Sequence, residues 1–174
     1  MKTRQPPLTF VDLFAGIGGF HLAMHNLGAK CVFAAEWDNS ARKTYQANFE
    51  EISPELFEDG GKWFAGDITL VNKEDIPDFD ILCAGFPCQP FSSAGKRAGD
   101  EDPRHLFPYI LDGIGRCRPA IVFLENVEGI ISSKLAGEGW RDPAGTPVLL
   151  HVFRELERIG YKATAGVFSA SEVG

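Results

Sequence analysis

A cysteine between two prolines is the residue of this chain best placed to do chemistry. The segment Pro87-Cys88-Gln89-Pro90 follows residues 81–85, an apolar run that reads as a short buried strand. Each proline restricts the backbone beside the thiol, and ligands gather past the carboxyl ends of strands in an open parallel sheet. Cys88 is therefore a candidate nucleophile. The alternative, a small buried hydrophobe, suits Cys83 inside the apolar run.

A carboxylate at the end of a second strand-like run could assist that nucleophile. Residues 120–124 are apolar and lead into Glu125, which Asn126 and Val127 follow. If the two strands are neighbours in the sheet, Glu125 and Cys88 emerge at the same edge. An acid buried beside a nucleophile has a raised pKa and can protonate the substrate. The alternative is a carboxylate that interacts with a helix N-terminus.

A nucleoside site is indicated near the start of the chain. Residues 15–19 form a glycine-rich turn after the first strand-like run, although His21 stands where a dinucleotide fingerprint has its third glycine. Glycines let the backbone approach a ligand at a helix N-terminus, and the alternative is a plain strand-to-helix turn. Glu36 and Asp67 end the next two strands, where carboxylates can accept from ribose hydroxyls and from an exocyclic amine. No P-loop lysine accompanies them, which favours a ligand with little phosphate, such as S-adenosylmethionine. Asp12, inside the first strand, is expected only to organise the turn.

Alternating strands and helices position these groups. The sequence predicts strands over residues 8–14, 30–36, 63–67, 79–85, 120–125 and 162–169, and helices over about 20–27, 39–49, 104–116 and 148–159. Residues 50–62, 92–103 and 132–145 are expected to be loops. The first helix should bury Phe20, Ala23, Met24 and Leu27, and the last should bury Leu149, Val152, Phe153 and Leu156. This pattern predicts an α/β fold, a doubly wound and mainly parallel sheet covered on both faces.

Composition fits one globular domain over residues 1–174, with 44% hydrophobic and 24% charged residues. No run of about 18 apolar residues occurs, and residues 1–7 are polar, so neither a membrane span nor a signal peptide is expected. Four scattered cysteines without a CxxC pair argue against a metal site and favour a reducing cytoplasm. The net charge of −7 is unusual for a protein that binds nucleic acid.

Together, these residues resemble the cytosine-C5 methyltransferase family, most closely its bacterial DNA-modifying enzymes of restriction-modification systems. Residues 10–20, 36–38 and 66–68 resemble the three cofactor motifs, residues 85–92 the nucleophile loop, and residues 125–127 the motif of the catalytic acid. The motifs come in the family's order. The resemblance implies a Rossmann-like fold of the S-adenosylmethionine-dependent type and a DNA (cytosine-5-)-methyltransferase.

The resemblance also implies the residue roles. Cys88 would add to C6 of a flipped-out cytosine and Glu125 would act at N3, because C5 is too weak a nucleophile without covalent addition. Pro87, Gln89 and Ser92 would contact the substrate. The implied cofactor residues are Phe14 against the adenine, Gly16, Ile17, Gly18 and Gly19 near the methionine moiety, Glu36 on the ribose, Trp37 beside the ring, Asp67 and Ile68 at the adenine, and Leu106. Core packing is the alternative role for Trp37. Residues 92–103 are a candidate loop for closing over the DNA, and the alternative is a simple solvated loop.

The family's later segments do not follow. An Arg-x-Arg segment that contacts the flipped base is expected just past residue 170, and the target-recognition domain after it is also absent. The fold is therefore expected to be incomplete at the C-terminus, and DNA and a complementing C-terminal fragment or subunit are the expected partners. The absent portion would also hold the Lys and Arg residues that neutralise phosphates. The alternatives are a catalytically incompetent S-adenosylmethionine-binding fragment, a split-enzyme subunit, or a tRNA cytosine-C5 methyltransferase.

Overall fold

The computed structural model describes residues 6–86, 106–135, 142, 144–169 and 171. The chain divides into two compact units. The first comprises Met1–Pro87 and Asp112–Glu125, and the second Cys88–Leu111 and Asn126–Gly174. The predicted loop over residues 92–103 lies outside the described residues.

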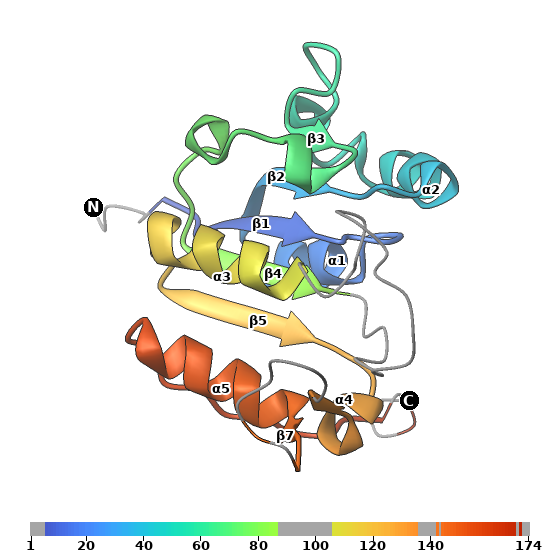
Figure 1. Cartoon of the computed structure of the whole chain (residues 1–174). Helices are drawn as coiled ribbons and strands as arrows, with labels where there is room; N and C mark the ends of the chain where they lie inside the picture. Colours follow the sequence, from blue (N-terminus) through green and yellow to red (C-terminus); the bar gives the residue numbers. More distant parts are fainter. Residues whose placement is uncertain (1–5, 87–105, 136–141, 143, 170, 172–174) are drawn as a thin grey trace, which may run out of the picture. The chain divides into compact units, whose positions relative to one another are not determined.

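A parallel five-stranded sheet forms the centre of the first unit (Figure 1). Its strands are β1 (Thr9–Leu13), β2 (Lys30–Ala35), β3 (Phe64–Ala65), β4 (Ile81–Gly85) and β5 (Ile121–Glu125). They lie in the order β3-β2-β1-β4-β5, and every neighbouring pair is parallel. The carboxyl ends of all five strands therefore share one edge, as the alternation of strands and helices predicts.

Two helices pack over one face of this sheet. They are α1 (Gly19–Asn26) and α2 (Asn39–Phe49), and the Asp38 side chain caps α2 by accepting from two backbone N–H groups. Aromatic rings dominate the core between these helices and the strands, among them Phe10, Tyr45, Phe49 and Phe64. Large rings bury more apolar area than any other side chains, so they supply much of the stability of this layer.

The predicted buried face of α1 is partly wrong. His21 and Met24 are the buried residues of this helix, whereas Ala23 is exposed. Leu27 is 81% exposed because it is the C-cap residue, beyond the last turn that packs on the sheet. The predicted buried face did not include His21, because it was drawn from apolar residues alone.

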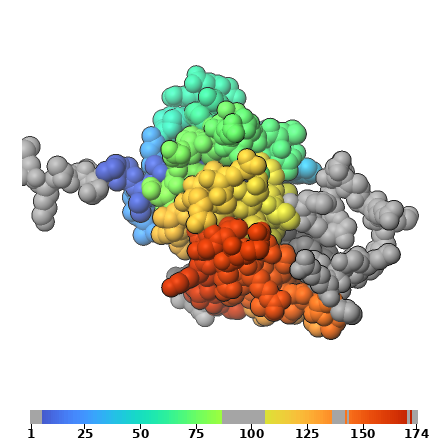
Figure 2. All heavy atoms as spheres, turned by 60° about the vertical axis from the view of Figure 1, so that its left-hand side comes forward, coloured from blue at the N-terminus to red at the C-terminus, as the bar shows by residue number. Residues whose placement is uncertain are grey.

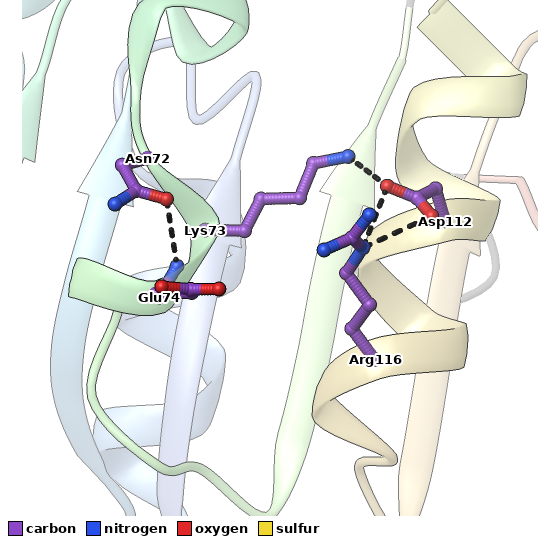
Figure 3. A network of polar contacts seen from close by, with 5 residues as sticks. All are labelled: Asn72, Lys73, Glu74, Asp112 and Arg116. Carbon is purple, nitrogen blue, oxygen red and sulfur yellow. Dashed lines mark hydrogen bonds and ion pairs between the residues drawn. The ribbon is translucent and has the colours of Figure 1, made fainter.

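Three short 3-10 helices fill the connections of the first unit: η1 (Pro54–Leu56), η2 (Ile68–Leu70) and η3 (Lys73–Asp75). Helix α3 (Leu106–Cys117) contributes its C-terminal half to this unit. Lys73 of η3 forms an ion pair with Asp112, which also accepts from Arg116 one turn later (Figure 3). The green surface of this region accordingly adjoins the yellow surface of α3 in Figure 2. These polar contacts lower the pKa of Asp112, with the Lys73 hydrogen bond as the largest cause.

The described part of the second unit contains α4 (Gly129–Ser132), a short antiparallel pair of β6 (Lys134–Leu135) and β7 (Thr146–Pro147), and α5 (Val148–Arg158). Helix α5 buries Val148, Val152 and Leu156. The predicted Leu149 and Phe153 are only half-buried, because the buried stripe follows positions four residues apart.

Two predictions for the second unit are wrong. Strand β6 lies within the segment expected to be a loop, and residues 162–169 form no strand. Most of the latter segment is exposed. A strand is stable only when a neighbour pairs with its backbone, and no described strand pairs with this one.

In the described part of the chain, no helix is long and apolar enough to cross a membrane.

Candidate active site

The glycine turn links β1 to α1 through backbone that is mostly left-handed. Phe14, Gly16 and Gly18 have φ values of 55°, 56° and 98°. At Gly18 a side chain would also collide with the core, because a Cβ there would lie 2.0 Å from Cε2 of Phe49. The turn therefore needs glycine at position 18 for two reasons, its backbone angle and its close approach to α2.

Glu36, directly after β2, is fixed by two backbone donors. The N–H of Gly16 donates to Glu36 Oε2 at 2.8 Å, and the N–H of Asp38 donates to Oε1 at 2.8 Å. The first bond ties the glycine turn to the end of β2. A carboxylate has about four lone-pair sites, so both oxygens of Glu36 can still accept hydrogen bonds from a ligand.

The second acid of the nucleoside site lies after β3. Asp67 Oδ1 accepts from the backbone N–H of Thr69 at 2.8 Å and from its hydroxyl at 2.7 Å, which orients the carboxylate. Ile68 beside it is buried. Glu36 thus follows β2 directly, and Asp67 lies two residues past the end of β3, the strand paired with β2.

Three apolar side chains predicted to contact the cofactor differ in exposure. Trp37 is 78% exposed and Ile17 is 62% exposed, whereas Phe14 is half-buried. The exposure of Trp37 contradicts core packing and leaves its ring available to a ligand. Leu106 begins α3 in the second unit, so its place relative to these residues is not described.

Glu125 lies where the sequence predicts, at the same sheet edge as the end of β4. Glu125 pairs with Gly85 in the register of β5 and β4. A Cβ on Gly85 would lie 3.3 Å from Glu125 Oε2 and 3.8 Å from the carbonyl oxygen of Phe14. The carboxylate therefore sits against the last residues of β4 and close to the end of β1. The expected burial is absent, because Glu125 is exposed. Pro87, Cys88, Gln89 and Ser92 lie outside the described residues.

The other cysteines are poor nucleophiles. Burial raises the pKa of Cys83 to about 12, with the Asp12 charge adding to the effect, and burial is also the main cause that raises the pKa of Cys31 and Cys117. Only the thiolate form attacks. All three are free thiols, and the buried positions of Cys31 and Cys83 agree with the structural role predicted for Cys83.

A buried polar cluster behind the glycine turn escaped sequence reasoning. Asp12 is fully buried, and burial raises its pKa to about 8, with Glu36 adding to the effect. Its oxygens make no hydrogen bond of ordinary geometry, although the backbone of His21 and the hydroxyl of Tyr45 lie close enough to lower the pKa. His21 Nδ1 lies 2.7 Å from the Tyr45 hydroxyl and Nε2 lies 3.2 Å from Ser53 Oγ. The sequence signal for this cluster was Asp12 itself, an acidic residue inside an otherwise apolar strand.

No group of three or more His, Cys, Asp or Glu residues within the described ranges could hold a metal ion. The arrangement instead offers glycine backbone and oriented carboxylates at adjacent strand ends, which suits an uncharged or cationic nucleoside derivative.

Comparison with solved structures identifies the fold class. The chain matches the crystal structure of S. pombe Dnmt2 methyltransferase with a TM-score of 0.58 and 24% identity, over 87% of this chain and 41% of that one. A Spodoptera frugiperda DNMT2 mutant matches with a TM-score of 0.63 and 23% identity over the same shares. The parallel sheet and its glycine turn therefore have the Rossmann-like methyltransferase fold.

Sequence comparison identifies the family. The model of the C-5 cytosine-specific DNA methylase family matches residues 8–174, and the chain belongs to that family. Type II methyltransferase M.HpaII of Haemophilus parainfluenzae is 55% identical over 125 residues, which are 70% of this chain and 32% of the relative. M.DsaV of Dactylococcopsis salina is 37% identical over 173 residues, 99% of this chain and 43% of the relative. The chain thus spans about a third to less than half of the length of these relatives.

Proposed function

We propose that this chain is the catalytic portion of a DNA (cytosine-5-)-methyltransferase, which transfers a methyl group from S-adenosylmethionine to C5 of a flipped-out cytosine. The observation that carries the proposal is the Glu125 carboxylate against Gly85, at the strand end that leads into Pro87 and Cys88. An acid and a thiol that leave neighbouring parallel strands at one edge can act on the same pyrimidine ring. Family membership supports the same reaction.

The described residues fit an adenosine-containing methyl donor. Both oxygens of Glu36 are oriented by backbone N–H groups and retain lone pairs for ribose hydroxyls. Asp67 is oriented to accept from the adenine amine, and the exposed Trp37 offers a ring to stack on. When bound, S-adenosylmethionine supplies an electrophilic methyl group. Phe14, Gly16, Ile17, Gly18, Gly19, Ile68 and Leu106 are proposed to complete this site.

The chain's own residues would carry the remaining chemistry. The Cys88 thiolate forms a bond to C6 of cytosine, and the electron pair displaced from the C5–C6 double bond moves toward N3. A proton held between Glu125 and N3 neutralises the developing charge. C5 can then take the methyl group, with S-adenosylhomocysteine as the leaving group. Water then accepts the C5 proton, the C5–C6 double bond re-forms, and Cys88 leaves C6 as a thiolate. Pro87, Gln89 and Ser92 are proposed to hold the flipped base.

DNA recognition is proposed to need more than residues 1–174. We infer that these residues form one partial catalytic and cofactor-binding domain, which works with a complementing C-terminal fragment or subunit. The net charge of −7 supports this, because affinity for DNA comes largely from Lys and Arg residues at phosphates. The bacterial cytoplasm is the proposed location, and the three free thiols of the described residues suit a reducing compartment.

Transfer of tritiated methyl groups tests the proposal. The chain is assayed on DNA and on tRNA, alone and mixed with the C-terminal part of a related type II methyltransferase. We expect transfer to DNA in the mixture, and Cys88→Ala should reduce it by at least about a thousandfold, because the covalent route is lost. Glu125→Gln should reduce it by about 10²–10⁴-fold, because a positioned proton donor contributes about that much.

Cys117→Ala is the matched control, because Cys117 is a free cysteine outside the proposed site and its substitution should not affect transfer. Unchanged transfer by Cys88→Ala would refute the role of Cys88. Cofactor binding without any transfer would favour a catalytically incompetent S-adenosylmethionine-binding fragment, and transfer to tRNA alone would replace the proposed acceptor.

A further inference from the structure

One arginine bonds to the ends of both strands that carry the nucleoside-site acids. Arg42 belongs to the first turn of α2, and its Nη1 donates to the carbonyl oxygen of Glu36 at 3.0 Å and to that of Ala65. Its Nη2 donates to the carbonyl oxygen of Phe64 at 2.9 Å. The guanidinium carbon also lies 4.2 Å from the centroid of the Phe64 ring. One side chain therefore bridges β2, β3 and α2.

Only arginine has the shape for these contacts. The guanidinium is a rigid planar fork with five N–H donors, and it stacks on aromatic faces, whereas lysine offers a single charged nitrogen. The carbonyl groups at Glu36 and Phe64 lie at strand ends, where few ladder partners remain. The half-buried Arg42 side chain donates hydrogen bonds to both of these carbonyl groups.

The same segment fixes Glu36 from its other side. The Glu36 carboxylate accepts from the Asp38 N–H, the Asp38 carboxylate caps α2, and the Arg42 N–H donates to the Asp38 carbonyl oxygen at 2.9 Å. These hydrogen bonds fix the backbone of residues 36–42 between the end of β2 and the first turn of α2. On the β3 side, only Gly66 separates Ala65 from Asp67.

We infer that Arg42 is a positioning residue, which sets the spacing between the Glu36 and Asp67 carboxylates and thereby makes the site selective for adenosine over nucleosides without the 6-amine. The inference rests on the proposed cofactor site. Glu36 and Asp67 lie on different strands that pair over only two residues each, Ala34 with Phe64 and Ala35 with Ala65. Beyond this short ladder, one backbone bond joins the strand ends, from the N–H of Glu36 to the carbonyl oxygen of Ala65 at 3.1 Å. Arg42 adds side-chain bonds to the carbonyl oxygens of Glu36, Phe64 and Ala65, and we expect these bonds to hold the two acids at a fixed spacing.

Two ligands that differ in a single group test this selectivity. S-adenosylhomocysteine carries the 6-amine, which would donate a hydrogen bond to the Asp67 carboxylate. S-inosylhomocysteine carries a carbonyl oxygen at position 6, which the carboxylate repels. Calorimetry of the full chain should show tighter binding of the adenosine ligand by about tenfold or more, as expected for a hydrogen bond to a charged group. Arg42→Met should reduce this ratio to less than about threefold.

Lys43→Met is the matched control, because Lys43 is the exposed neighbour on the same helix and its loss changes the charge equally. It should keep the wild-type ratio. In an Asp67→Asn background, Arg42→Met should cause no further loss of selectivity, because Arg42 acts through Asp67. If Arg42→Met weakens the binding of both ligands by the same factor, the ratio of their affinities is unchanged. Arg42 then has only a structural role, and the inference is overturned.

Arg42→Lys covers the case in which Arg42→Met does not fold. Lysine keeps the charge and the alkyl stem but cannot reach three carbonyl groups at once, so a folded Arg42→Lys variant should also lose selectivity. A wild-type ratio in that variant overturns the inference. The two proposals fail in different ways: if the wild-type chain binds neither ligand, the cofactor site itself is refuted, whereas binding with unchanged selectivity in the Arg42 variants refutes only the role of Arg42.

Discussion

Adding one methyl group at Gly18 should destabilise the protein far more than the same change elsewhere in the glycine turn. The Cβ of alanine at position 18 would lie 2.0 Å from Cε2 and 2.6 Å from Cζ of Phe49. Phe49 cannot simply move away, because its ring stacks on His21 at a centroid distance of 3.9 Å and packs on Tyr45 at 4.8 Å. The methyl group therefore pushes on a buried aromatic stack.

Two effects add to the expected loss for Gly18→Ala. Overpacking a filled core costs about 1–3 kcal/mol, and left-handed backbone costs a residue with a Cβ about 1–2 kcal/mol. The backbone term applies because φ at Gly18 is 98°. We expect the free energy of unfolding to fall by about 2–5 kcal/mol, measured by urea unfolding of the ligand-free chain.

Two neighbouring glycines separate the effects. Gly16 has φ of 56° and open space around its Cβ position, so Gly16→Ala should lose only the backbone term, about 1–2 kcal/mol. Gly19 is the first residue of α1, its φ is not positive, and the space around its Cβ position is open. Gly19→Ala should therefore leave the free energy of unfolding unchanged or raise it by up to about 1 kcal/mol. If Gly18→Ala and Gly16→Ala lose the same free energy, the packing of Phe49 against the turn is not rigid, and the steric reasoning is refuted.

The remaining predictions concern pH. The pKa of Asp12 is raised to about 8, so the folded chain keeps a proton that the unfolded chain loses above pH 4. The contribution of Asp12 to stability therefore falls as the pH rises from about 4 to 8. Asp12→Asn should match wild type at pH 4 and exceed it by on the order of 4 kcal/mol at pH 7; a constant difference across this range would contradict the raised pKa. Burial lowers the pKa of His21 to about 4, so the unfolded chain gains a proton below pH 6.5 that the folded chain excludes. The contribution of His21 to stability should therefore fall by up to about 3 kcal/mol as the pH drops from 6.5 to 4, which opposes the contribution of Asp12 in that range. In urea unfolding, His21→Gln should remove this contribution, so that its stability relative to wild type rises as the pH drops from 6.5 to 4. A difference from wild type that stays constant over this range would show that His21 makes no such contribution.

The sequence by itself predicts those features that depend on neighbouring residues. Apolar runs placed β1, β2, β4 and β5 to within about two residues. The acids at the strand ends, Glu36 and Glu125, followed from the same runs. Parallel topology also followed, because strands that alternate with helices must run the same way.

Residue types misled the prediction where the tertiary environment overrides them. His21 was not among the residues expected to be buried. Phe10 and Phe49 nevertheless enclose its ring, and Tyr45 and Ser53 lie within hydrogen-bonding distance of its nitrogens. Residues 162–169 have the composition of a strand, yet they have no paired neighbour among the described strands. A side chain's polarity does not decide its burial when partners elsewhere in the chain can satisfy it.

Only the tertiary structure decided how the groups of the candidate site meet. The register that pairs Gly85 with Glu125, the bond from Gly16 to Glu36, and the contacts of Arg42 with β2 and β3 each join residues far apart in the chain. Sequence periodicity determines which face of an element is buried, whereas register and side-chain contacts depend on how separate elements pack together. The residue types of the site were therefore readable from the sequence, and their geometry was not.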